Sequence, residues 1–204
     1  MADAPSYIYL ASRSLRRREL LQQIRVEHES LMLRVNPPRE PDVKEDPVPG
    51  ESPSDYVTRI CRAKAEAAWN RMIERQLPHK AVLAADTTVC LGDEIFGAPA
   101  NAEEARITLR RLSGRQHRVL TAVALKLEGA LDLAVSESTV RFRYIEKEEL
   151  ERYVDSGEPL GKAGGYAIQG RAAIFVSELH GSYSGVVGLP LYETAAMLKK
   201  FGVM

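Results

Sequence analysis

The stretch that decides the fold is Val82-Leu83-Ala84-Ala85-Asp86-Thr87-Thr88-Val89, which lies within an apolar run over residues 81–91. Its length and its β-branched residues predict a buried strand, interrupted by the polar Asp86-Thr87-Thr88. An unpaired buried carboxylate is costly, so we expect Asp86 to bind a metal ion, to accept hydrogen bonds or to have a raised pKa. Each state suits a base that activates water, or a ligand of a divalent ion. The alternative is a structural Asp bonded to loop amides.

Strand and helix patterns alternate on both sides of this stretch. Before it we expect a strand at 7–11, a helix at 15–24 capped by Ser14, a strand at 26–35, a proline-rich loop at 36–53 and a long helix at 52–76. The inner side of that long helix is predicted to carry Tyr56, Ile60, Ala63, Ala67 and Trp69.

After it we expect a helix at 101–112 capped by Asn101, strands at 117–127 and 131–144 in a hairpin about Gly129, a helix at 146–156, a glycine-rich loop at 157–170, a strand at 173–179, a loop at 181–188 and a final helix from Pro190. The pattern predicts a mixed α/β protein whose long sheet contains antiparallel pairs. At 204 residues, one domain over 1–204 or two closely fused lobes is expected.

Composition narrows the class of protein. Hydrophobic residues make up 45% and charged residues 27%, and 28 basic side chains balance 28 acidic ones. A net charge of zero argues against a nucleic-acid scaffold. The cysteines, Cys61 and Cys90, fit neither a disulfide framework nor a zinc cluster and are predicted to be buried free thiols. We see no signal peptide and no membrane span, so we expect a cytoplasmic protein.

A basic segment, Ser12-Arg13-Ser14-Leu15-Arg16-Arg17-Arg18, begins the first predicted helix. Arginines in a first helical turn face the positive end of the helix dipole, which is unfavourable. An anion held by the free N–H groups and the guanidinium groups would reverse the sign of that interaction. The segment is therefore a candidate phosphate site, with a solvated basic patch as the alternative.

The glycine-rich loop at 157–170 is the next candidate. Its glycines would let the backbone approach a ligand, Lys162 could supply a charge for phosphate, and Gln169 carries the donor and acceptor that suit reading a base edge. It is not a P-loop, because no Ser or Thr follows the Gly-Lys pair. A plain flexible loop is the alternative. Taken alone, Lys64 reads as a surface lysine, Glu45 as a solvated acid, and His117 as a cap of the preceding helix.

Six motifs in order resemble the Maf family of nucleoside triphosphate pyrophosphatases. They are Leu10-Ala11-Ser12-x-Ser14-x-Arg16-Arg17-x-Glu19-Leu20-Leu21, Arg62-Ala63-Lys64-Ala65, Ala85-Asp86-Thr87, Leu112-Ser113-Gly114-Arg115-x-His117, Gly164-Gly165-Tyr166-Ala167-Ile168-Gln169-Gly170, and Gly181-Ser182-Tyr183 through Val187-Gly188-Leu189-Pro190. The resemblance implies a two-lobed fold like that of inosine triphosphate pyrophosphatases, with a central cleft, and a homodimer.

The resemblance also implies roles for particular residues. Asp86 would be the general base, with Mg²⁺ or Mn²⁺ held by Asp86 and Glu45. The substrate-binding set would be Ser12, Arg16, Arg17, Lys64 and Lys162. The combination of Arg16, Thr87 and Gln169 resembles the branch that hydrolyses dTTP, UTP and modified uridine triphosphates and clears them from the nucleotide pool.

Two departures from the family pattern matter. Leu15 replaces a proline at the first helical turn, which removes some preorganisation. Ala98 stands where the family has a phosphate-contacting lysine, which predicts reduced activity or compensation by Lys162 or Arg13. Ala98 keeps open a second hypothesis, a non-catalytic nucleotide-binding regulator of septum formation. A third hypothesis is the same reaction with a preference for 7-methyl-GTP.

Overall fold

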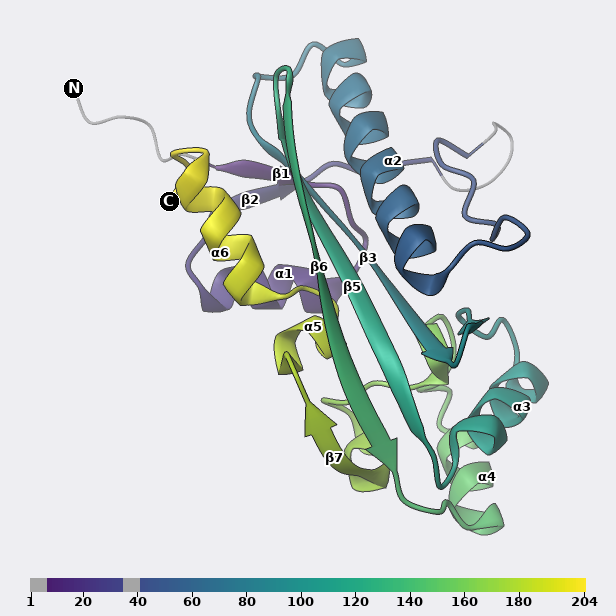
Figure 1. Cartoon of the computed structure of the whole chain (residues 1–204). Helices are drawn as coiled ribbons and strands as arrows, with labels where there is room; N and C mark the ends of the chain where they lie inside the picture. The colour runs from purple at the N-terminus through teal and green to yellow at the C-terminus, as the bar shows by residue number, and fades with distance from the viewer. Residues whose placement is uncertain (1–6, 35–40) are drawn as a thin grey trace. The chain divides into compact units, whose positions relative to one another are not determined.

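The computed structural model describes residues 7–34 and 41–204 and has the predicted mixed α/β architecture (Figure 1). Its elements are β1 (Ile8–Leu10), α1 (Leu15–Gln23), β2 (His28–Ser30), α2 (Pro53–Glu74), β3 (Val82–Leu91), β4 (Glu94–Phe96), α3 (Ala102–Leu112), β5 (Gln116–Leu127), β6 (Ala130–Phe142), α4 (Lys147–Asp155), β7 (Val176–His180), α5 (Tyr183–Val187) and α6 (Leu191–Lys200), with 3₁₀ turns at Ala163–Gly165 and Arg171–Phe175.

The strands form one seven-stranded sheet in the order β2-β1-β3-β5-β6-β7, with β4 pairing to β3 outside this path. β1 runs parallel to both β2 and β3, whereas β4 is antiparallel to β3 and β7 is antiparallel to β6. The turn between β5 and β6 contains Glu128 and Gly129, as the predicted hairpin requires. β3 runs unbroken from Val82 to Leu91, which confirms the strand predicted at 81–91 and places the polar Asp86, Thr87 and Thr88 inside it.

The chain divides into two compact units. The first consists of Met1–Asp86, Thr121–Val135 and Gly188–Met204, and the second of Thr87–Leu120 and Ser136–Val187. The central cleft stays a prediction. None of the helices in the part of the chain that the structure describes is both long and apolar enough to cross a membrane.

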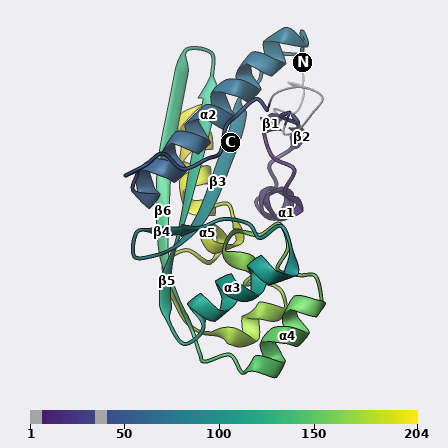
Figure 2. The ribbon, with the colours of Figure 1, turned by 90° about the vertical axis from the view of Figure 1, so that its right-hand side faces the viewer.

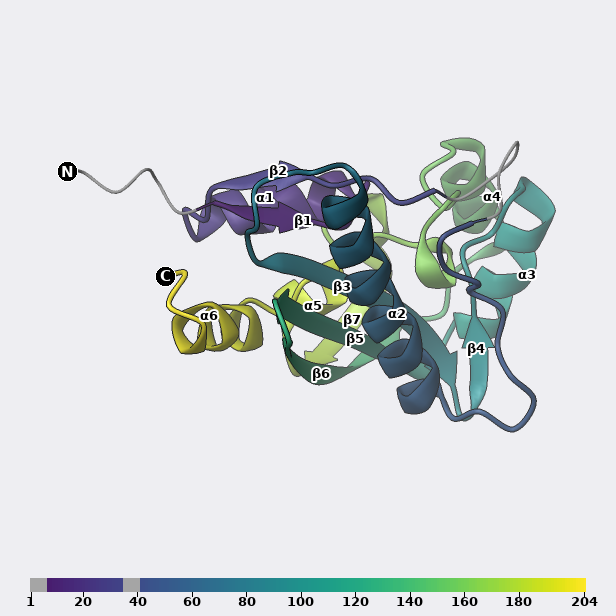
Figure 3. The ribbon, with the colours of Figure 1, turned by 90° about the horizontal axis from the view of Figure 1, so that it is seen from above.

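In the first unit, α2 and α6 lie on opposite sides of the strands (Figures 2 and 3). Ser52 caps α2 as predicted, by accepting a hydrogen bond from the Asp55 backbone. The predicted inner face of α2 is largely wrong. Only Ile60 of the five predicted residues is fully buried, and the buried residues are Pro53, Val57, Ile60, Cys61, Ala65, Ala68 and Met72. The buried face is shifted by about one residue from the predicted one, so that Val57 and Ala68 are buried where Tyr56 and Ala67 were predicted, and Trp69 is half-buried. Lys126 of β5 places its Nζ 5.9 Å from the Trp69 ring centroid.

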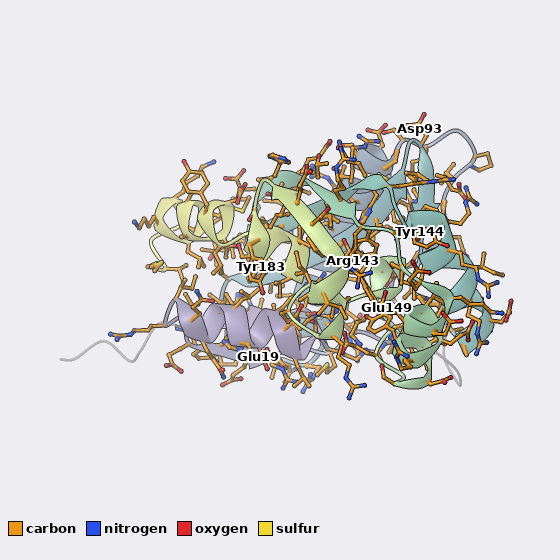
Figure 4. The ribbon with its side chains drawn as sticks, turned by 90° about the horizontal axis from the view of Figure 1, so that it is seen from below. Glu19, Asp93, Arg143, Tyr144, Glu149 and Tyr183 are labelled. Carbon is orange, nitrogen blue, oxygen red and sulfur yellow. The ribbon has the colours of Figure 1, made fainter. Side chains whose placement is uncertain are left out.

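The second unit has its own core, in which aromatic rings meet edge to face. The Phe142 ring lies 4.9 Å from the His117 ring and 4.9 Å from the Tyr166 ring, measured between centroids. His117 Nε2 also forms a 2.8 Å hydrogen bond with the Tyr166 hydroxyl. His117 is 2% exposed and lies on β5, so it is a core residue rather than a helix cap. At the surface of this unit, Arg143 and Glu149 form a two-pronged ion pair (Figure 4).

Three segments differ from their predicted structure. The strand predicted at 26–35 is reduced to His28–Ser30, and Val35 lies outside the described residues. The backbone N–H of Arg34 bonds to the Asp42 side chain instead of a neighbouring strand. In the strand predicted at 173–179, a 3₁₀ turn occupies Arg171–Phe175, because Ala172 and Phe175 are buried at the three-residue spacing of such a turn. The loop predicted at 181–188 contains the short helix α5.

Candidate active site

The start of α1 places polar groups of Ser12, Ser14 and Arg17 close together. Ser14 is the N-cap, and its Oγ accepts a 3.4 Å hydrogen bond from the Arg17 backbone. Ser12 Oγ accepts hydrogen bonds from the Ser14 backbone at 3.1 Å and from Arg17 Nη1 at 3.2 Å. Arg17 Nε donates to the Gly188 carbonyl at 2.8 Å. The first turn of α1 contains no acidic residue, so its positive end faces basic side chains.

Asp86, Lys64 and Glu45 form what we call the Lys64 cluster. Asp86 lies at the middle of β3 with only 7% of its surface exposed. Lys64 on α2 approaches it, and the distance from Lys64 Nζ to Asp86 Oδ1 is 2.7 Å. The same Nζ lies 3.0 Å from Glu45 Oε1. One ammonium therefore contacts two carboxylates from segments far apart in the sequence, and Asp86 is charge-paired with Lys64.

Tyr56 and Arg59 hold the backbone at Glu45. The Tyr56 hydroxyl donates a 2.9 Å hydrogen bond to the Glu45 carbonyl. Arg59 donates to the next carbonyl, that of Asp46, at 3.1 Å and forms a two-pronged pair with Glu51. Neither role is predicted by the sequence pattern. Tyr56 and Lys64 are eight residues apart on α2 and so share a helix face, a spacing that could have pointed to Tyr56.

A partly buried ion pair between Arg34 and Asp42 joins the segments on the two sides of residues 35–40. Asp42 accepts hydrogen bonds from Arg34 through its backbone N–H at 2.8 Å and through Nε at 2.7 Å. Arg71 Nε of α2 lies 3.7 Å from the same carboxylate. Burial raises the pKa of Asp42, but the hydrogen bonds from Arg34 and the charge of Arg71 outweigh it and leave that pKa below its ordinary value. Through its contact with Arg71, Asp42 connects the segment that carries Glu45 to α2.

A pocket in the first unit joins these groups. Its lining comprises Ala11, Ser12, Arg13, Arg17, Leu33, Arg34, Val43, Glu45 and Lys64. Four basic side chains and one acidic side chain face a space bounded by the start of α1, the segment after β2 and the middle of α2. Such a pocket is suited to an anion with several negative charges.

Electrostatic coupling links Arg17 to the Lys64 cluster. Burial lowers the pKa of Arg17, and the carboxylates of Asp86 and Glu45 oppose that shift. Burial raises the pKa of Cys61 to about 12, and the charge of Asp86 adds to the shift. Cys61 therefore stays a thiol at neutral pH and is not a nucleophile. Cys61 and Cys90 are both buried free thiols, as predicted.

The other predicted site residues, Arg16, Thr87, Lys162 and Gln169, do not line this pocket. Arg16 lies half-buried in the first turn of α1. Thr87, Lys162 and Gln169 belong to the second unit, where Thr87 is half-buried on β3 and Gln169 is exposed. The loop that carries Lys162 pairs with the segment around Ala98, because Gly161 and Gly164 donate backbone hydrogen bonds to the Pro99 and Gly97 carbonyls, each at 3.1 Å. Lys162 thus lies in the loop that pairs with the segment containing Ala98.

The chain is similar to one family model, to named relatives and to a solved structure. The family model named Maf-like protein matches residues 7–201. The dTTP/UTP pyrophosphatase of Nitrosomonas europaea is 52% identical over 203 residues, covering 100% of this chain and 98% of its own length. That of Cupriavidus pinatubonensis is 53% identical over 194 residues, covering 95% and 96% respectively. A solved structure, the Ham1 protein of Staphylococcus aureus, aligns with 67% of this chain and 72% of its own at 15% identity and a TM-score of 0.44. From the match over residues 7–201 and these full-length relatives, the chain belongs to the Maf-like protein family.

Proposed function

We propose that this protein is a nucleoside triphosphate pyrophosphatase that hydrolyses dTTP, UTP and modified uridine triphosphates to the monophosphate and pyrophosphate, and so clears unwanted nucleotides from the pool. The observation that carries the proposal is the buried Asp86 carboxylate, paired with Lys64 next to a pocket that four basic side chains line. Relatives with this name that match the chain over nearly its full length support the substrate class.

Asp86 is proposed as the general base. Water attacks the α-phosphorus in line with the leaving pyrophosphate, and Asp86 accepts the proton that the water loses. The attack breaks the bond between the α-phosphorus and the bridging oxygen. Asp86 lies on a strand at the centre of the sheet order, so its carboxylate is held rigidly for this step.

Arg17, Arg16, Ser12 and Lys64 are proposed to bind the phosphates. The pyrophosphate gains negative charge as it leaves, and guanidinium and ammonium groups already in place stabilise that charge. The Ser12 hydroxyl and the Gly188 carbonyl orient the Arg17 guanidinium. Lys162 is proposed as a further phosphate ligand that compensates for Ala98.

A divalent ion is part of the proposal, with Asp86 and Glu45 as its protein ligands. Within residues 7–34 and 41–204, no group of three or more His, Cys, Asp or Glu side chains could hold a metal ion on its own. Mg²⁺ is commonly bound by one or two carboxylates together with substrate phosphates, and the two carboxylates of the Lys64 cluster fit that mode. The ion would supply charge neutralisation for the triphosphate. Thr87, Gln169 and Arg16 are proposed to read the base, and the homodimer and the cytoplasmic location stay predictions.

The test of the catalytic assignment is pyrophosphate release by the Asp86→Asn variant. We expect kcat to fall by about a hundredfold or more, the range for loss of a general base. The matched control is Asp93→Asn, because that carboxylate is 94% exposed in the turn after β3 (Figure 4). Native turnover by Asp86→Asn would exclude Asp86 as the base.

A substrate panel tests the proposed reaction and its specificity. The native protein is incubated with Mg²⁺ or Mn²⁺ and with dTTP, UTP, a 5-substituted UTP or 7-methyl-GTP. Faster pyrophosphate release from dTTP, UTP and the 5-substituted UTP supports the proposal. Faster release from 7-methyl-GTP would mean that the reaction is right and the proposed base preference is wrong. Nucleotide binding without turnover under any condition would favour the non-catalytic regulator.

A further inference from the structure

Lys64 occupies the position where the two carboxylates of the cluster converge. Its Nζ lies 2.7 Å from Asp86 Oδ1 and 3.0 Å from Glu45 Oε1. The side chains of Lys64 and Asp86 are only 15% and 10% exposed, so water screens their interaction weakly. A divalent ion that used both carboxylates would share their oxygens with this ammonium.

The charges around the cluster cancel. Asp86 and Glu45 carry two negative charges, and Lys64 carries one positive charge. Arg17 lines the same pocket as Glu45 and Lys64 and adds a second positive charge. A site of zero net charge that already holds an ammonium attracts a divalent ion poorly, because the repulsion between the two cations offsets the attraction of the carboxylates.

We propose that Lys64 makes divalent-ion binding conditional on the nucleotide. A triphosphate brings phosphate oxygens that pair with Lys64 and Arg17, which releases the carboxylates of Asp86 and Glu45. The same phosphates complete a coordination shell that two carboxylates leave unfinished. Ion and nucleotide therefore bind with positive coupling, and by linkage each raises the affinity for the other by the same factor.

This conditional binding has a consequence for Asp86. While Lys64 donates to Oδ1, it occupies one of the acceptor sites of that oxygen. Transfer of Lys64 to a phosphate leaves this acceptor site to a water molecule when substrate is present. The inference rests on the proposed pyrophosphatase site, since it assigns Lys64 to the phosphates of that substrate.

The first experiment measures Mn²⁺ binding without nucleotide, from the electron paramagnetic resonance signal of free Mn²⁺. Lys64→Met removes the charge at nearly constant length, and we expect it to bind Mn²⁺ about tenfold or more tightly than the native protein. Lys64→Arg keeps the charge and should stay close to native. The matched control is Lys126→Met, because Lys126 pairs with Glu66 at 3.0 Å and is similarly buried outside the cluster.

The second experiment repeats the titration with a UTP analogue in which a methylene group bridges the α- and β-phosphorus and prevents cleavage. The analogue should increase the Mn²⁺ affinity of the native protein more than that of Lys64→Met. Damage to the fold would weaken binding, so tighter binding by Lys64→Met is a result that a merely structural lysine cannot give.

Two results would overturn the inference: Mn²⁺ binding to Lys64→Met that is no tighter than native, or an analogue that increases the affinity of both proteins equally. Failure of the proposed function is separate, because the first titration needs no turnover. A native protein that releases no pyrophosphate while Lys64→Met binds Mn²⁺ tightly would reject the proposed reaction and leave the role of Lys64 at the ion standing.

Discussion

His117 is expected to make the stability of this protein fall in mild acid. Burial lowers the pKa of His117 from 6.5 to about 4, and its contact with the Arg115 backbone opposes only part of that shift. As the pH falls, the unfolded chain binds a proton at this residue before the folded chain does. The stability contribution is therefore complete above about pH 6.5 and is lost as the pH falls towards 4.

The magnitude follows from the two pKa values. Between pH 7.5 and pH 4.5 the difference in proton binding amounts to about 2.5 kcal/mol of unfolding free energy. Carboxylates with a lowered pKa, such as Asp42 and Glu149, lose their contributions to the unfolding free energy mainly below about pH 4.5. The change in unfolding free energy between pH 7.5 and pH 4.5 therefore comes mainly from His117.

Urea unfolding followed by far-ultraviolet circular dichroism measures this effect at several pH values. The native protein should lose about 2.5 kcal/mol across the window, and His117→Gln, although less stable at pH 7.5, should show a nearly flat profile. His180→Gln is the matched control, because the His180 side chain is 77% exposed. Parallel profiles for native protein and His117→Gln would refute the reasoning.

Two further substitutions test contacts at the site and in the second core. Tyr56→Phe deletes the hydroxyl that bonds to the Glu45 carbonyl, so kcat/KM for UTP should fall about fivefold, the equivalent of about 1 kcal/mol for one hydrogen bond. An unchanged kcat/KM would show that this hydroxyl does not contribute to the site. Gly164→Ala places a Cβ 2.8–2.9 Å from Val89 at a φ of +66°, and urea unfolding should show a loss of about 3 kcal/mol. Gly161→Ala has a similar φ and nothing within 4 Å, so its loss should stay near about 1 kcal/mol, and equal losses would rule out the clash.

Local signals were enough to predict most elements. The caps Ser14, Ser52 and Asn101 lie where the sequence predicts them, because each side chain satisfies a backbone N–H within three residues. The segments predicted wrongly depend on distant contacts. β2 ends at Ser30, before the end of the predicted strand, and Arg34 bonds to the Asp42 side chain. No local sequence pattern connects Arg34 with Asp42.

The site residues also differ in how far local sequence signals predict them. A bonded, buried Asp86 could be predicted, because a carboxylate inside an apolar run is costly without a partner, whereas its catalytic role stays a prediction. Lys64 and Glu45 had no such signal, and only the family resemblance connected them to Asp86. Their meeting depends on how α2 packs on the sheet and on the Tyr56 and Arg59 contacts, which sequence spacing does not encode. The roles of Thr87 and Gln169 stay predictions.

The position of Trp69 next to Lys126 has a practical consequence. Trp69 is the single tryptophan of the chain and belongs to the first unit, whereas His117 belongs to the second. Intrinsic fluorescence therefore reports on one unit, and circular dichroism reports on both. If the two signals change at the same urea concentration, the units unfold together, and if they separate in mild acid, the unit that contains His117 unfolds first. The molecule thus carries a built-in optical probe of its own cooperativity.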